Sequence, residues 1–228
     1  MQFSLQALWG QLLIGLVNGA FYAMLSIGLA LIFGMLNIVN FAHGALYMLG
    51  AFVAWALLAQ WDIGYWWSLL LAPVAVGVFG MLVERLALRR IAKLDHLYGL
   101  LLTFGLAAAI EGLLTATLGS MSRPYPVPEA FHGVFDLGFM VMPRYRVWVV
   151  AASLAVCLST WVLVEKTQLG SYLRAATENS SLVRAFGVRV PLIIMVTYGI
   201  GAALAALAGV PAAPILQVSP SMGNGLLV

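Results

Sequence analysis

The hydrophobic pattern along the chain consists of long apolar stretches separated by shorter polar or charged segments. A membrane-spanning helix needs about 20 mostly apolar residues, because the hydrocarbon core of a bilayer is about 30 Å thick. Stretches of about that length cover residues 8–36, 45–60, 66–83, 96–118, 147–164 and 192–213. Membrane-spanning strands are excluded, because these stretches do not alternate and open strands in lipid leave backbone groups unpaired. The pattern predicts an all-α fold, a polytopic transmembrane helix bundle of six spans, forming a single domain over residues 1–228.

Composition narrows the class of protein further. Of the 228 residues, 63% are hydrophobic and 8% are charged, whereas a typical soluble domain has about 45–50% and about 25%. These values exclude a disordered chain, a disulfide scaffold and an ordinary cytosolic enzyme. The first apolar stretch is too long for a signal peptide and has no basic segment before it, so we expect a retained helix. The single cysteine, Cys157, lies in an apolar stretch and is expected to be a small buried side chain.

The distribution of Lys and Arg predicts an orientation in the membrane. The connections after the third and fifth stretches carry eight basic residues, and the connection after the fourth carries three. Because basic residues are enriched in cytoplasmic connections, the first two connections are expected inside the cell. The N-terminus and the turn at Asp62 are then expected outside.

The external connection, residues 119–143, contains prolines at alternate positions from Pro124 to Pro128. Proline fixes φ, so an extended path is expected there. This segment is interpreted as a lid, as a docking surface for an external partner or as a rigid connector.

The cytoplasmic connection, residues 165–191, is rich in helix-forming residues from Ser171 to Phe186. One or two short helices are expected, with Gly187 as the helix stop. Leu173, Ala176, Leu182, Ala185 and Phe186 are expected to form an apolar face. Such a face suits docking of a partner, or a position on lipid headgroups.

Polar residues interrupt the apolar region between positions 8 and 58. The interruption consists of Asn37, Asn40, Phe41, His43 and Gly44. At membrane depth, irregular polar backbone persists only when it is buried in protein or lines a cavity. One interpretation is a broken helix at a translocation path or gate, and the other is a cytoplasmic turn.

Glu111 lies near the middle of the fourth stretch. A carboxylate there costs about 2.5–3.5 kcal/mol, so it is expected to face the bundle interior and to be paired or protonated. It is a candidate pathway or gate residue, with an interhelical hydrogen bond as the structural alternative.

Small residues recur along the first and last stretches and allow close helix packing. They are Gly15, Gly19, Gly28, Gly34, Gly201, Ala202, Ala205, Ala206 and Gly209.

Motifs for enzymatic chemistry are missing from the sequence. It contains no G-x-x-x-x-G-K-[ST], no H-E-x-x-H, no C-x-x-C and no G-x-S-x-G, and its histidines have no metal-ligand spacing. We therefore expect no enzyme activity, metal or cofactor in this chain.

Several segments resemble the permeases of branched-chain amino acid ABC importers, of the LivH type. They are Asn18–Leu29, Phe33-Gly34, Asn40-Phe41-Ala42-His43-Gly44, Gly50-Ala51, Gly170 to Gly187, Gly199 to Ala203, Ala208 to Val210 and Pro220 to Gly223. The resemblance extends over nearly the whole chain, and Asn-Phe-Ala-His-Gly is its most specific motif. The family continues past Pro-Ser-Met-Gly with further spans, so a truncated chain or a fragment is expected.

The resemblance implies a mechanism and a set of partners. A periplasmic or lipid-anchored solute-binding protein delivers the solute, and a second homologous permease completes the path. Two ATP-binding subunits, which use ATP and Mg, dock on the cytoplasmic loop. The loop residues implied are Gly170, Arg174, Ala175, Ala176, Glu178 and Gly187.

The location implied is the plasma membrane of a bacterium or archaeon, in contact with membrane lipid and without nucleic acid as a partner. Branched-chain amino acids are the expected substrates. The alternatives are an ABC permease for urea or short-chain amides, an ATP-independent channel or secondary carrier, and a membrane-embedded scaffold without transport.

Overall fold

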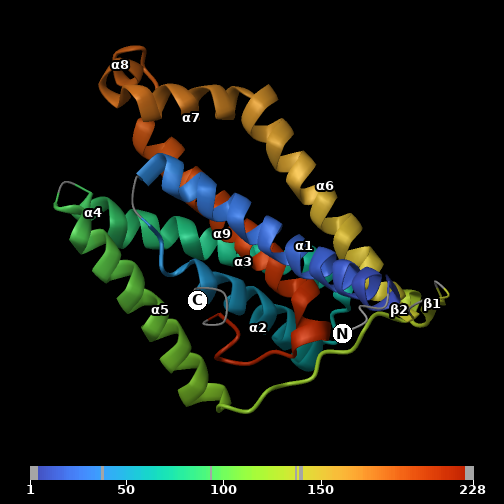
Figure 1. The fold of residues 1–228 in the computed structure, drawn as a ribbon. Helices are drawn as coiled ribbons and strands as arrows, with labels where there is room; N and C mark the ends of the chain where they lie inside the picture. Colours follow the sequence, from blue (N-terminus) through green and yellow to red (C-terminus); the bar gives the residue numbers. More distant parts are fainter. Residues whose placement is uncertain (1–4, 37–38, 93, 137, 139–140, 224–228) are drawn as a thin grey trace.

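Six long helices account for most of the computed structural model (Figure 1), which describes residues 5–36, 39–92, 94–136, 138 and 141–223. They are α1 (Leu5–Leu36), α2 (His43–Trp61), α3 (Tyr65–Val83), α5 (His96–Leu118), α6 (Arg144–Lys166) and α9 (Val190–Leu216). Each coincides with a predicted apolar stretch and is long enough to cross a membrane. The prediction of an all-α bundle of six spans is confirmed.

Helix α9 lies at the centre of the bundle and packs against α1, α2 and α3. Its close contacts depend on small residues. A methyl group on Gly209 would collide with the Tyr47 carbonyl of α2, and one on Gly50 would collide with Ala206 of α9. Since a larger side chain would push the helices apart, the small residues of α9 set the spacing at the core.

The prediction of close packing holds for only part of the first apolar stretch. A methyl group on Gly28 would lie 3.0 Å from the Gly201 carbonyl of α9, so these helices touch there. Gly15, Gly19 and Gly34 have nothing within 4 Å of that position among the described residues. These three glycines therefore take no part in the contact between α1 and α9.

Helices α5 and α6 lie at the periphery. Only 17% of each span is buried, compared with 56% of α9. Helix α5 contacts mainly α2, and α6 contacts mainly α1. The outer faces of both helices are exposed within this chain.

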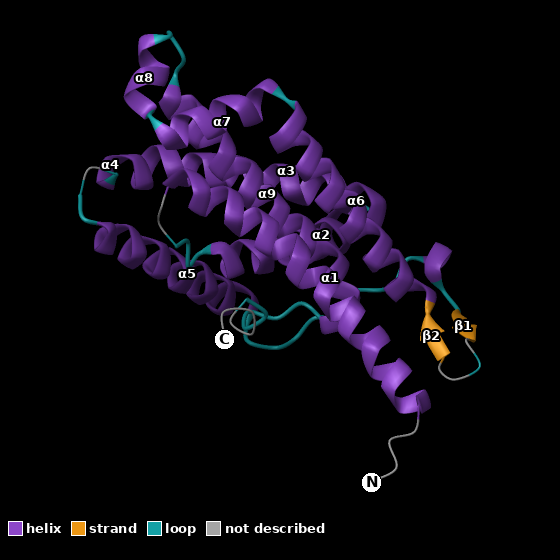
Figure 2. Ribbon diagram, turned by 45° about the horizontal axis from the view of Figure 1, so that its top comes forward, coloured by secondary structure: helices purple, strands orange, loops and turns teal. Residues whose placement is uncertain are grey.

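One end of the bundle carries two short helices, α7 (Gln168–Glu178) and α8 (Ser180–Ala185) (Figure 2). This confirms the prediction of one or two short helices between Ser171 and Phe186. Gly187 follows them with φ of +81°, a conformation that glycine adopts without strain. Helix α3 continues at this end through a π-helical turn, η1 (Glu84–Leu88), into α4 (Arg89–Ile91).

The opposite end carries a short 3-10 helix, η2 (Glu129–Phe131), and an antiparallel hairpin. Strand β1 (Val134–Asp136) pairs with β2 (Val141–Pro143), and Phe135 lies opposite Met142. Figure 2 shows the hairpin beyond the end of α6.

The proline-rich segment is attached to the bundle at its start. Arg123 and Val218 exchange backbone hydrogen bonds of 2.8 and 3.0 Å. The Arg123 guanidinium lies 4.3 Å from the centre of the Trp55 ring, and its Nη2 donates to the Leu118 carbonyl at 2.6 Å. These contacts favour the rigid connector among the three interpretations of residues 119–143.

Candidate functional site

The polar interruption between α1 and α2 is buried against α9. Asn37 lies outside the described residues, whereas Asn40 is only 2% exposed. Asn40 Nδ2 donates to the Tyr198 hydroxyl of α9 at 3.1 Å, and its Oδ1 accepts from the Ala42 backbone N–H at 3.1 Å. One side chain thus fixes both the turn and the contact with α9.

His43 places the start of α2 within the bundle. Its Nε2 lies 3.0 Å from the carbonyl oxygen of Leu25. Leu25 precedes the last residue of α1 by 11 positions, which corresponds to about 16 Å along a helix. Helix α2 therefore begins at the level of Leu25, about 16 Å from the end of α1 along the helix axis. Its first residue, His43, is buried.

Three buried side-chain polar atoms of α2 and α9 have no hydrogen-bond partner among the described residues. They are His43 Nδ1, Tyr47 Oη and Thr197 Oγ1. Buried polar atoms are rarely unsatisfied, so a water, an ion or a ligand group often completes such sites. We refer to Asn40, His43, Tyr47, Thr197 and Tyr198 as the α2 polar cluster.

Sequence reasoning identified two members of the α2 polar cluster and missed three. Tyr47 lies one helical turn after His43, so the i, i+4 spacing was an available signal. Thr197 and Tyr198 are adjacent polar residues within a 27-residue apolar helix, which was a second signal.

Phe41 and Gly44 contact other elements. The Phe41 N–H donates to Thr103 Oγ1 of α5 at 3.3 Å, and the Phe41 ring meets Phe104 edge-to-face with centroids 6.5 Å apart. A methyl group on Gly223 would lie 2.5 Å from the Gly44 carbonyl. The interruption thus connects α2 to α5 and to the segment that follows α9.

Glu111 lies on α5 and is partly buried. Its backbone carbonyl accepts a hydrogen bond from Thr115 Oγ1 at 2.8 Å. Its assignment to a pathway or gate stays a prediction.

Three residues of the predicted coupling loop attach α7 to the bundle. Gly170 fits closely against the Val164 carbonyl of α6. Arg174 Nη1 donates to that carbonyl at 2.6 Å and to Glu165 Oε2 at 3.2 Å. Ala176 is buried with Val183 and Val190.

The remaining loop residues face outward. Ala175 and Glu178 are exposed, and Gly187 ends the helical pair. The predicted apolar face is split, because Leu173 and Ala176 pack inward whereas Leu182 and Phe186 are 57% and 79% exposed. Leu182 belongs to α8 and Phe186 follows it directly, and α8 lies beyond α7 at one end of the molecule (Figure 1).

An aromatic cluster occupies the hairpin end. Phe131 and Trp148 stack with centroids 5.1 Å apart, and Trp148 Nε1 donates to the Tyr65 hydroxyl at 3.1 Å. The Tyr145 hydroxyl donates to the Pro211 carbonyl at 3.0 Å. Tyr65 also lines a cavity of about 520 Å³ together with residues of the proline-rich segment. Tyr125 belongs to that segment, and burial raises the pKa of its hydroxyl. The aromatic residues fix the connector to the ends of α3 and α6.

Metal binding has no support in the part of the chain that the structure describes. No three His, Cys, Asp or Glu side chains come together there in a way that could hold a metal ion.

Comparisons with known proteins agree with the helical pattern. Residues 11–228 match the family described as branched-chain amino acid transport system / permease component. No solved structure matches the chain.

The high-affinity branched-chain amino acid transport system permease protein LivH of Escherichia coli (strain K12) is 27% identical over 215 residues, which cover 88% of this chain and 68% of LivH. BraD of Pseudomonas aeruginosa is 29% identical over 211 residues, covering 88% of this chain and 69% of BraD. A probable branched-chain amino acid transport permease protein, LivM of Methanocaldococcus jannaschii, is 28% identical over 146 residues, covering 62% of this chain and 41% of LivM. With six apolar helices and a family match over nearly its whole length, this integral multi-pass membrane protein belongs to the branched-chain amino acid transport permease family.

Proposed function

We propose that the chain is a membrane-spanning subunit of an ATP-driven ABC importer for leucine, isoleucine and valine. The observation that carries this proposal is the start of α2 at membrane depth, where His43 Nε2 lies 3.0 Å from the Leu25 carbonyl. Around it, the α2 polar cluster leaves hydrogen-bonding atoms unsatisfied within an apolar bundle. A broken helix with such atoms suits a path for a zwitterionic solute.

The path residues proposed are Asn37, Asn40, Phe41, His43, Gly44 and Glu111. Few fixed charges lie along the spans, which suits a substrate whose own charges cancel. A second, homologous permease subunit would complete the path, because the outer faces of α5 and α6 are exposed in this chain.

ATP hydrolysis is assigned to two partner subunits that dock on α7 and α8. Glu178, Leu182 and Phe186 supply exposed contacts, while Arg174 and Gly170 hold α7 on α6. This loop lies in the cytoplasm, and the N-terminus and the hairpin lie outside, where a solute-binding protein would deliver the substrate. The docked ATPases would shift the inward–outward equilibrium only through contacts that differ between the two states.

Uptake of labelled leucine tests the substrate and the energy source together. Host cells with and without the gene are compared, with urea as a competing solute and with ATP depleted in a parallel sample. We expect deletion to abolish an ATP-dependent uptake that urea does not inhibit. Uptake that persists without ATP would indicate a channel or secondary carrier, and inhibition by urea would indicate a urea or amide permease.

Docking of the ATPases is tested by Phe186→Ser. Truncating a central interface aromatic weakens association by about 2 kcal/mol or more, so leucine uptake is expected to fall about tenfold or more. Phe186→Tyr is the matched control, because it keeps an aromatic ring at the same position, which is 79% exposed. Equal uptake by the two variants would contradict docking through α8.

A further inference from the structure

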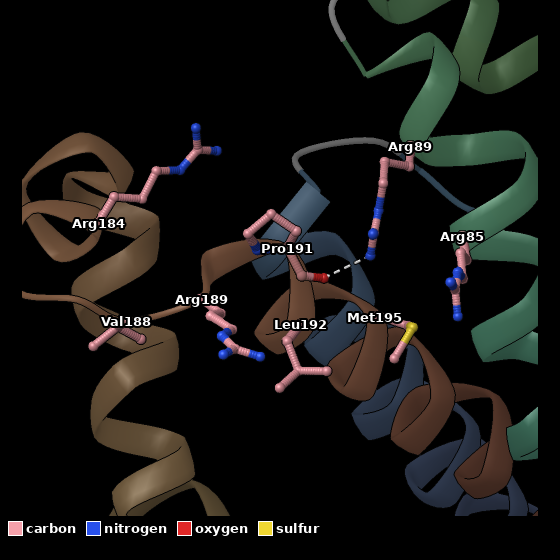
Figure 3. Close-up of a pocket in the computed structure, with 8 residues that line it drawn as sticks. All are labelled: Arg85, Arg89, Arg184, Val188, Arg189, Pro191, Leu192 and Met195. Atoms are coloured by element: carbon pink, nitrogen blue, oxygen red, sulfur yellow. Dashed lines mark hydrogen bonds between the residues drawn. The ribbon is translucent and has the colours of Figure 1, made fainter.

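A basic cavity lies at the end of the bundle that carries α8. Arg85, Arg89, Arg184 and Arg189 line a space of about 460 Å³ together with Val188, Pro191, Leu192 and Met195. Figure 3 shows Arg85 of η1 and Arg89 of α4 on one side, and Arg184 of α8 and Arg189 at the start of α9 on the other. The lining combines guanidinium groups with apolar side chains.

One of the four arginines is neutralised and held in place by its neighbours. Arg89 Nε and Nη2 donate to the two carboxylate oxygens of Glu84 at 3.3 and 2.9 Å. Arg89 Nη2 also donates to the Pro191 carbonyl at 2.8 Å, as the dashed line in Figure 3 marks. Arg89 of α4 therefore ties η1 to the start of α9.

The other three arginines keep their positive charge facing one cavity. Arg85, Arg184 and Arg189 are exposed. Within the described residues the ion pairs are Arg89–Glu84 and Arg174–Glu165, so these three arginines have no carboxylate partner there. Three like charges around one space repel each other, and an anion between them relieves that repulsion.

The level of the cavity indicates which anion would be present. Leu192 and Met195 belong to the first turns of the α9 span, and Arg85 and Arg89 belong to the last turns of the span that includes α3. This is the boundary between hydrocarbon and water, where lipid phosphates lie. Basic pockets between helices at this level suit anionic headgroups, and Arg binds phosphate oxygens in a bidentate manner.

We propose that this cavity binds an anionic phospholipid. Its phosphodiester lies among Arg85, Arg184 and Arg189, and the start of an acyl chain lies against Leu192 and Met195. A lipid held there bridges η1, α8 and the start of α9. The proposal is independent of the transported solute and of the energy source.

Lipid retention by the purified full-length chain tests the proposal. Native mass spectrometry of the detergent-solubilised protein is titrated with phosphatidylglycerol and, separately, with phosphatidylcholine. We expect preferential retention of phosphatidylglycerol. Arg85→Gln with Arg184→Gln is expected to weaken that retention about tenfold.

The matched control is Arg90→Gln with Lys166→Gln. These residues are exposed at the same end of the bundle, carry the same charge and do not line the cavity. We expect the control to retain phosphatidylglycerol within twofold of the unchanged chain. Neither double variant is expected to melt at a lower temperature than the unchanged chain, because none of the four side chains forms an ion pair within the described residues.

Three results would overturn the proposal. Equal losses of phosphatidylglycerol retention in the two double variants would show a general effect of charge. No loss in either variant would show that the lipid does not bind in the cavity and would indicate an acidic segment of a protein partner as its occupant. Displacement of phosphatidylglycerol by millimolar inorganic phosphate would identify a site for free phosphate.

Discussion

The helices α1, α2, α3 and α9 and the helices α5 and α6 are all apolar enough to cross a membrane, but they differ in how this chain packs them. The first group is joined by glycine and alanine contacts at which one additional methyl group would collide with the neighbouring helix. Helices α5 and α6 have most of their surface exposed. Because lipid is as apolar as leucine, hydrophobicity alone does not bring helices together, and small residues mark the positions where they pack.

The strongest test of this difference places the same substitution in each group. Gly209→Ala is expected to lower the free energy of unfolding by about 1–3 kcal/mol, because the new methyl group meets the Tyr47 carbonyl. Gly105→Ala on α5 has no atom within 4 Å of the added carbon among the described residues and is expected to be neutral or stabilising. Melting of the purified proteins, followed by size-exclusion chromatography, measures both. Equal melting temperatures would contradict α9 as the packed centre.

Polar packing in the core is tested by Asn40→Leu. The substitution leaves the buried Tyr198 hydroxyl without its partner and removes the acceptor for the Ala42 N–H, at an expected cost of about 1–3 kcal/mol. Adding Tyr198→Phe removes the orphaned hydroxyl, so the double variant should recover part of the loss in melting temperature. If the two substitutions simply add, the Asn40–Tyr198 hydrogen bond contributes nothing.

A smaller effect distinguishes two ion pairs. The Glu84 side chain is 3% exposed and holds Arg89 through two hydrogen bonds, whereas the partners Glu165 and Arg174 are each about half exposed. Glu84→Gln is expected to cost about 1–2 kcal/mol, and Glu165→Gln about 0–1 kcal/mol. Chemical denaturation of the two variants in one detergent provides the comparison. A cost for Glu165→Gln as large as that for Glu84→Gln would contradict this ranking.

Much of the fold could be predicted from the sequence because span length is a property of the bilayer. The six helices and the two short helices at one end follow from apolar length and helix-forming composition. The depth of the α1–α2 interruption could not be predicted, because it depends on His43 reaching back to Leu25. Arg85 is separated in sequence by about a hundred residues from Arg184 and Arg189, so only the packing of α9 against α3 and η1 brings the three to one cavity.

The candidate site was predicted in part for a similar reason. Asn40 and His43 are conspicuous within an apolar region, whereas Tyr198 can be identified as the partner of Asn40 only from the packing of α9, which places its hydroxyl 3.1 Å from Asn40. The split of the predicted apolar face also depends on tertiary packing. Val183 packs inward with Ala176, which leaves Leu182 and Phe186 outside.

The π-helical turn at Glu84–Leu88 determines which arginine faces α9. Such a turn is equivalent to one additional residue in an α-helix and rotates everything after it by about 100°. The rotation brings Arg89 to Glu84 and the Pro191 carbonyl, while its neighbour Arg90 stays exposed. If the same residues formed a regular α-helix, Leu88 would take the direction that Arg89 has here, whereas deleting one residue within the turn would leave the direction of Arg89 unchanged. The number of residues in this turn, as well as their types, therefore determines where the positive charges lie at this end of the protein.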